Sequence, residues 1–175
     1  QNTIVSTQSA TDFSNVPDSS IDYIFVDPPF GENLMYSELN YLYEAWLKIA
    51  TNNNDEAIMN KSQNKSISEY NSLMHTCFKN LFRVLKPNRW ITIEYHNSKS
   101  AIWNGLQESI TKAGFVIAHT SILKNKGGSF VINVSPNSVA NDLMINAYKP
   151  SEKFIEKFTS SVGVNLEGDF IDLVL

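Results

Sequence analysis

The chain has 175 residues, within the usual size of one domain, and its 42% hydrophobic and 18% charged residues exclude a disordered chain. Its net charge of −4 excludes a general polyanion binder, so a role on nucleic acid would require a local basic patch or a further domain. Because Cys77 is the only cysteine and no apolar run nears the roughly 20 residues that span a bilayer, we expect a cytoplasmic protein without disulfides or membrane contact.

Two strands are predicted in the first part of the chain. TIVST, residues 3–7, is β-branched and favours a short strand, and the Pro-containing NVPDSS that follows favours a turn. IDYIFV, residues 21–26, is nearly continuously apolar, which is typical of a central parallel strand covered on both faces. The 4, 3, 4, 3 spacing of the next apolar residues predicts an amphipathic helix. These residues are Met35, Leu39, Leu42, Trp46 and Ile49.

A polar loop and a second helix follow. Residues 51–66 are rich in Asn, which predicts a surface loop with one helical turn. Ser66 or Ser68 can cap the next helix, and KPNR, residues 86–89, ends it because proline cannot continue a helix. One apolar stripe runs along this helix: Tyr70, Leu73, Cys77, Leu81 and Leu85.

Strands dominate the rest of the chain. WITIEYH, residues 90–96, predicts a strand, and Ser98 or Ser100 can cap a helix that ends near Gly114. That helix has an apolar face of Ile102, Leu106, Ile110 and Ala113. Further predicted elements are a long hairpin of strands 115–123 and 142–148 and a short helix around Lys153–Phe158. Strands and helices that alternate and end in a hairpin indicate an open α/β sheet.

The motif DPPF, Asp27 to Phe30, follows directly after the strand of residues 21–26, and ligands of open α/β sheets bind at this end of the strands. Proline has a fixed φ and no N–H, so the turn is stiff and offers carbonyl acceptors. An ionised Asp27 offers acceptors only. Together they suit a group that donates two N–H bonds, such as the exocyclic amine of a nucleobase, and Phe30 offers a face for the base to stack on. The alternative is a turn that only ends the strand.

This amine would need help to react. Its lone pair is delocalised into the aromatic ring, and two acceptors that hold its hydrogens out of the ring plane would free that lone pair. Attack on a methyl sulfonium carbon could then be in line, with alignment supplying much of the rate and no metal required. The amine is inaccessible within a duplex, so the base would have to be flipped out or lie in a single strand.

DPPFG after an apolar strand resembles the catalytic motif of bacterial adenine-specific, amino-group DNA methyltransferases. The likeness extends over residues 3 to about 150 and includes FRVLKPNRWITIEYHNS and NDLMINAYKP. It implies a Rossmann-like S-adenosylmethionine-dependent methyltransferase fold with a C-terminal antiparallel hairpin. Residues 1–150 would be a partial catalytic domain and residues 151–175 a truncated extension.

The resemblance also implies roles for individual residues. Asp27 and the Pro28 carbonyl would bind the target amine, Pro29 belongs to the same catalytic motif, and Phe30 would stack on the flipped base. TQSATDF corresponds to the family segment that surrounds the adenine of the cofactor, S-adenosylmethionine. The matching cofactor-binding positions are Ser9, Ala10, Asp12 and Asp27. The family often has Gly-Asp where this chain has Gln8-Ser9.

The family's glycine-rich cofactor loop is missing. None of the seven glycines forms such a loop after a strand, and the acidic ribose-binding element that follows it is absent as well. The chain also begins with Gln1 and ends in an apolar stretch. We therefore expect the second half of the domain, from about the third strand, which alone binds cofactor weakly and is inactive. Its partners would be DNA, the remaining half of the domain and a recognition domain.

Other candidate substrate contacts are Gly31 after the motif, His96 and Asn97 at the same sheet edge, and Asn60 and Lys61 in the polar loop. An ordinary helix cap and a solvated loop are the alternatives for the last four. No His and Cys residues have metal-ligand spacing, so we expect no metal.

The expected function is methylation of adenine N6 in DNA. The rival hypotheses are cytosine N4 in DNA, guanine N2 in RNA, an inactive methyltransferase-fold binding domain and a small-molecule α/β enzyme. Restriction, phage defence and housekeeping stay open as biological roles.

Overall fold

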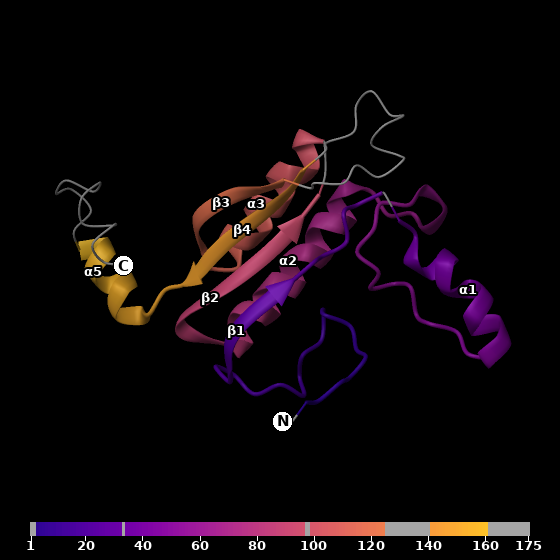
Figure 1. Cartoon of the computed structure of the whole chain (residues 1–175), viewed down its shortest axis with the longest axis horizontal. Helices are drawn as coiled ribbons and strands as arrows, with labels where there is room; N and C mark the ends of the chain where they lie inside the picture. The colour runs from indigo at the N-terminus through magenta and orange to yellow at the C-terminus, as the bar shows by residue number, and fades with distance from the viewer. Residues whose placement is uncertain (1–2, 33, 97–98, 125–140, 161–175) are drawn as a thin grey trace.

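The computed structural model describes residues 3–32, 34–96, 99–124 and 141–160. Strands and helices alternate along these residues as the sequence predicts (Figure 1). The elements are β1 (Ile21–Val26), α1 (Tyr36–Leu47), the 3₁₀ turn η1 (Lys61–Gln63), α2 (Ile67–Val84), β2 (Leu85–Tyr95), α3 (Ser100–Lys112), β3 (Val116–Lys124), β4 (Asn141–Lys149) and α5 (Glu152–Ser160). None of the described helices is long and apolar enough to cross a membrane.

One mixed sheet with the strand order β1-β2-β4-β3 organises the described chain. β1 runs parallel to β2, with Val26 opposite Ile93, whereas β4 is antiparallel to both β2 and β3. The predicted terminal hairpin is therefore confirmed as the pair β3 and β4, and its connection, residues 125–140, lies outside the described residues. Because β1 and β2 are parallel, the residues that follow Val26 and Tyr95 meet at one edge of the sheet.

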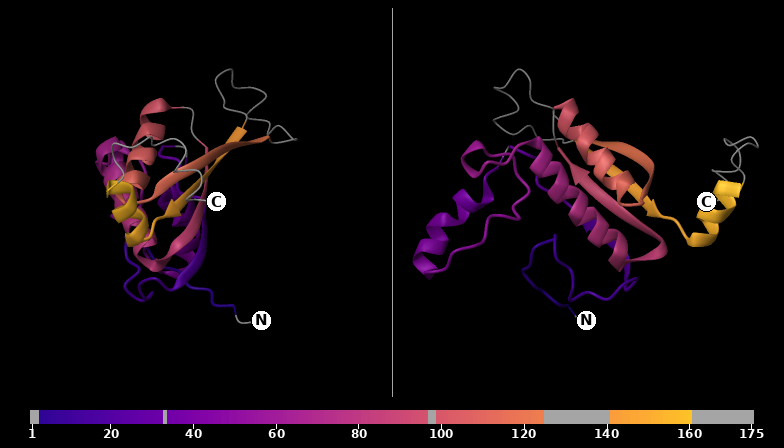
Figure 2. Two further views of the ribbon diagram at one scale, coloured as in Figure 1. Left: turned by 90° about the vertical axis from the view of Figure 1, so that its left-hand side faces the viewer. Right: turned by 180° about the vertical axis from the view of Figure 1, so that it is seen from behind.

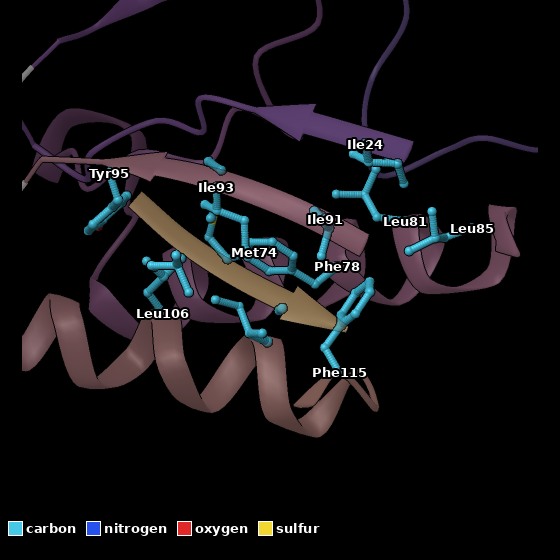
Figure 3. Close-up of a cluster of buried hydrophobic side chains, with 14 of the residues drawn as sticks. Ile24, Met74, Phe78, Leu81, Leu85, Ile91, Ile93, Tyr95, Leu106 and Phe115 are labelled. Atoms are coloured by element: carbon cyan, nitrogen blue, oxygen red, sulfur yellow. The ribbon is translucent and has the colours of Figure 1, made fainter. Parts of the chain in front are cut away.

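Helices α2 and α3 cover one face of the sheet, as the view from behind shows (Figure 2). The core lies between them and the inward side chains of β2 and β4, and Figure 3 shows part of this cluster. Its most fully buried members include Tyr70, Met74, Phe78, Ile91, Ile93, Tyr95, Leu106 and Ile145. The buried face of α2 is therefore rotated from the predicted apolar stripe. Met74 and Phe78, which the prediction left out, are buried, whereas the predicted Leu73 and Cys77 are only half-buried.

The ends of the helices follow local rules with one exception. Ser66 caps α2 in a capping box, in which the Ser68 amide lies 3.1 Å from its hydroxyl and the Glu69 carboxylate accepts from its backbone amide at 2.8 Å. Gly114, which follows the C-cap residue Ala113 of α3, has a φ of +106°, as expected of a terminal glycine. Ser100, however, is the first residue of α3, and its cap position is taken by Lys99, whose side chain makes no capping hydrogen bond.

The predicted strand at residues 3–7 is wrong. These residues belong to no regular element, and Ile4 and Val5 are 93% and 90% exposed. β-branched residues favour a strand only where a neighbouring strand and a covered face are available. In the described chain β1 pairs with β2 alone, so residues 3–7 have no strand beside them.

Two expectations about burial are also wrong. β1 is an edge strand of the described sheet, and its Tyr23 and Phe25 are exposed rather than covered. The helix α1 forms where predicted, but none of its residues is buried, and it projects away from the sheet (Figure 1). In both cases the apolar pattern predicted the element correctly, while the described residues supply no layer to cover it.

Candidate active site

The Asp27–Phe30 turn lies where the sequence predicts, at the carboxyl end of β1. Pairing of Val26 with Ile93 fixes the last residue before the turn against the buried centre of β2. Beyond the turn, the Gly31 carbonyl accepts a hydrogen bond of 3.1 Å from the Met59 amide. Gly31 has a φ of +91°, and a Cβ there would lie 3.2 Å from Ile102. The positive φ and the close approach of Ile102 therefore explain why a glycine stands at position 31. Gly31 is buried and has no side chain with which to contact a substrate.

Two tyrosines on different elements contact the Asp27–Phe30 turn. Tyr70 of α2 donates its hydroxyl hydrogen to the Pro29 carbonyl at 2.7 Å. The Tyr95 hydroxyl, at the end of β2, lies 3.0 Å from that of Tyr70. The Tyr95 ring also meets Phe30 edge to face, with 5.4 Å between ring centroids. Sequence analysis placed Tyr70 on an apolar stripe and missed this role of its hydroxyl.

A contact between a histidine and an aspartate lies beside the turn. His96, directly after β2, makes a 2.8 Å contact through Nδ1 with Oδ1 of Asp142 on β4, and its ring centroid lies 6.0 Å from that of Phe30. His96 is thus at the expected sheet edge, whereas Asn97 lies outside the described residues. Asp142 was not predicted, because the predicted hairpin pairs β4 only with β3, whereas in the structure the start of β4 also lies beside the end of β2.

The electrostatics of Asp27 differ from those of an ordinary surface carboxylate. Desolvation raises its pKa, and the negative charge of Asp142 raises the pKa further. Burial likewise raises the pKa of Tyr95, and it raises that of Tyr70 still more strongly. Both phenols therefore stay protonated and remain able to donate.

A cavity of about 380 Å³ brings the two separate predictions together. Ser9 and Ala10 line it from the N-terminal segment, and Asp27, Pro28 and Pro29 line it from the turn. Its remaining walls are Phe13, Val26, Asp55, Glu56, Ala57, Met74, Cys77, Phe78 and Leu81. The apolar stripe of α2 was the signal for part of this wall, since Cys77 and Leu81 belong to it.

Three predicted site residues lie elsewhere. The carboxylate of Asp12 accepts a 2.9 Å hydrogen bond from the Ser14 amide, which lowers its pKa, and Asp12 does not line the cavity. Asn60 caps η1 through a 2.8 Å bond from the Ser62 amide and donates to Glu38 at 3.1 Å. Lys61 is exposed, and it lines a separate cavity together with Asn60. Within the described ranges, no group of three His, Cys, Asp or Glu could hold a metal ion.

Comparison with known proteins supplies the family. A family model described as DNA methylase, N6_N4_Mtase, matches residues 21–162. The chain belongs to this DNA methylase family. The match begins at β1 and includes the Asp27–Phe30 turn and His96, and the methyl donor of the family is S-adenosylmethionine. No curated protein matches the chain in sequence.

Solved structures of similar fold are longer than this chain. The PvuII DNA methyltransferase, which is cytosine-N4-specific, is 16% identical with a TM-score of 0.50 over 78% of this chain and 45% of that chain. A candidate DNA modification methylase from Thermus thermophilus is 14% identical with a TM-score of 0.48 over 86% of this chain and 56% of that chain. The likeness to the PvuII enzyme shows the fold alone, and it confirms the predicted methyltransferase sheet. The chain spans about half the length of both.

Proposed function

We propose that this member of the DNA methylase family carries the amine-binding part of an enzyme that methylates the exocyclic N6 of adenine in DNA. One observation carries the proposal: Asp27 and the two prolines line the same cavity as Ser9 and Ala10, and Phe30 follows at the end of the turn. A carboxylate and a proline carbonyl side by side accept two N–H bonds and donate none. An exocyclic amine of a flipped base satisfies both acceptors.

The cavity suits one part of the cofactor. Its volume falls in the range of roughly 300–1,000 Å³ typical of small-molecule sites, and most of its lining is apolar or aromatic. Ser9 and Ala10 would hold the flat adenine of S-adenosylmethionine against Phe13 and Phe78, and Asp27 would face both cofactor and target. Asp12 stays outside this set because its carboxylate is engaged in a local turn. The remaining half of the domain and a recognition domain are the proposed further partners.

The chain's own residues would orient the amine. S-adenosylmethionine supplies an activated methyl group bound to a positively charged sulfur. Asp27 and the Pro28 carbonyl hold the two amine hydrogens, so that the nitrogen lone pair points out of the base. The cofactor would supply the methyl carbon, with the electron pair of its C–S bond left on sulfur, and Asp27 and the Pro28 carbonyl would align the nitrogen lone pair with that carbon. The nitrogen then carries one proton too many, which passes to the Asp27 carboxylate or to water.

Cytosine N4 is the second candidate. Asp27 and Phe30 address only an amine and a ring face, which adenine and cytosine share, and the PvuII enzyme of similar fold is cytosine-N4-specific. The deciding experiment uses the protein expressed with the sequence that flanks these residues in its gene, labelled S-adenosylmethionine, and DNA and RNA offered separately. Label in N6-methyladenine from DNA supports the proposal, and label in N4-methylcytosine favours the second candidate. Label in RNA guanine, or none at all, overturns both.

Replacement of Asp27 tests the mechanism. Asp27→Ala should lower kcat by about 10²–10³-fold or more, because a preorganised acceptor at the reacting nitrogen is lost. Asp22→Asn is the matched control: Asp22 lies in β1, the strand that precedes Asp27, and it is exposed and paired with Lys86 at 2.8 Å. It should leave turnover unchanged. Equal activity of the Asp27 variant and the control would refute the assignment.

A further inference from the structure

The hydroxyls of Tyr70 and Tyr95 form a chain that ends at the turn. Tyr70 is fully buried and donates to the Pro29 carbonyl at 2.7 Å. A hydroxyl has one hydrogen, so the 3.0 Å contact between the tyrosines must use the hydrogen of Tyr95 and the oxygen of Tyr70. The order of donation is therefore fixed: Tyr95 to Tyr70, and Tyr70 to Pro29.

The same pair also holds the next residue. The Tyr95 ring meets Phe30 edge to face at 87°, with 5.4 Å between centroids. The carbonyl of Pro29 and the ring of Phe30 are consequently fixed from one side, by side chains that stand on α2 and on β2. Two packed regular elements are a more precise support than a loop.

This support selects which acceptors remain for the substrate. The turn has consecutive prolines and so lacks two backbone donors, while its carbonyls still need partners. Tyr70 occupies the Pro29 carbonyl, and within the described part of the chain no hydrogen bond reaches the Pro28 carbonyl. The Asp27 carboxylate and the Pro28 carbonyl are left as two acceptors for the two hydrogens of one amine.

We propose that Tyr70 and Tyr95 are positioning residues, which set the orientation of the Asp27–Phe30 turn for methyl transfer. The inference rests on the proposed function, and it assigns neither tyrosine a contact with the substrate. A shift of about 1 Å at a reacting atom can cost about 10²-fold in rate. Tyr70→Phe should therefore lower kcat by about 10–100-fold while KM for S-adenosylmethionine changes less than about threefold.

The series arrangement gives a sharper expectation. Tyr95 reaches the carbonyl only through Tyr70, so Tyr95→Phe should cost less than Tyr70→Phe, and the double variant should be no slower than Tyr70→Phe alone. Tyr148→Phe is the matched control, because it removes a hydroxyl bonded at 2.6 Å to Asn88, at the opposite end of β2. That variant should retain the wild-type kcat.

A second readout separates this inference from the proposed function. With 4-fluorophenylalanine at position 30, the ¹⁹F resonance should shift or broaden in Tyr70→Phe and Tyr95→Phe but not in Tyr148→Phe. If the wild-type protein transfers no methyl group, the proposed function fails, and the ¹⁹F comparison still decides whether the tyrosines hold the turn. An unchanged resonance, additive kcat losses, or a loss expressed in KM alone would overturn the positioning role.

Discussion

Lys149 is expected to contribute more than any other described lysine to the stability of α2, the helix that carries Tyr70. It is 8% exposed on β4, and its ammonium group donates to the carbonyls of Phe82 and Leu85 at 2.6 and 2.7 Å, at the C-terminal end of α2. It also lies 4.6 Å from the centre of the Phe82 ring. One cation thereby satisfies carbonyls that the helix end leaves without partners.

The magnitude follows from opposing terms. Each hydrogen bond from a charged donor contributes about 1.5–3 kcal/mol, so Lys149→Met removes about 3–6 kcal/mol. The variant regains the desolvation penalty of the buried ammonium, which is several kcal/mol. Methionine retains the apolar stem, so the free energy of unfolding should fall by about 2 kcal/mol net, or about 4–8 °C in Tm.

Urea unfolding followed by tryptophan fluorescence measures this difference, with Lys86→Met as the control. Lys86 pairs with Asp22 at 2.8 Å, but both side chains are exposed, so the control should lose at most about 1 kcal/mol. If Lys149→Met loses less than about 0.5 kcal/mol, or no more than Lys86→Met, the reasoning about the buried helix end is refuted.

Two further predictions concern acidity and helix packing. Asp27 must be ionised to accept the amine, so kcat/KM should fall as the pH drops through the raised pKa of Asp27. Asp142→Asn removes one cause of the raised pKa and should move this fall in kcat/KM to lower pH. A fall that stays at the same pH, or moves to higher pH, would contradict the assignment. Gly105→Ala should destabilise the protein to urea by about 1 kcal/mol, because the new Cβ would lie 2.6 Å from Nδ2 and 2.7 Å from Cγ of Asn71, and this outweighs the helix propensity gained. Combined with Asn71→Ala, the same change should instead stabilise, and equal effects in both backgrounds would show that the two helices do not meet there.

The helix ends that the sequence predicted correctly have local causes. Ser66, one of the two serines proposed as the cap of α2, acts within the first turn of that helix, and the glycine after α3 acts on its own turn. The errors concern what covers an element. The strand at residues 3–7 and the burial of α1 depended on neighbours that the described chain does not supply, and an apolar pattern contains no information about which neighbour is present.

In the candidate site, too, the features with local causes were predicted and the long-range contacts were not. The Asp27–Phe30 turn was predicted because it is four consecutive residues, and Ser9 and Ala10 were predicted through a family resemblance. What holds the turn in place is long-range: Tyr70 lies 41 residues from Pro29, and Asp142 lies 46 residues from His96. A short motif specifies the reacting groups, but their orientation depends on α2, β2 and β4 packing together. The Asp27–Phe30 motif by itself is therefore weak evidence for activity. The motif together with the hydroxyls of Tyr70 and Tyr95 is stronger evidence. Removal of the Tyr70 hydroxyl is for this reason the better test of whether the site is active.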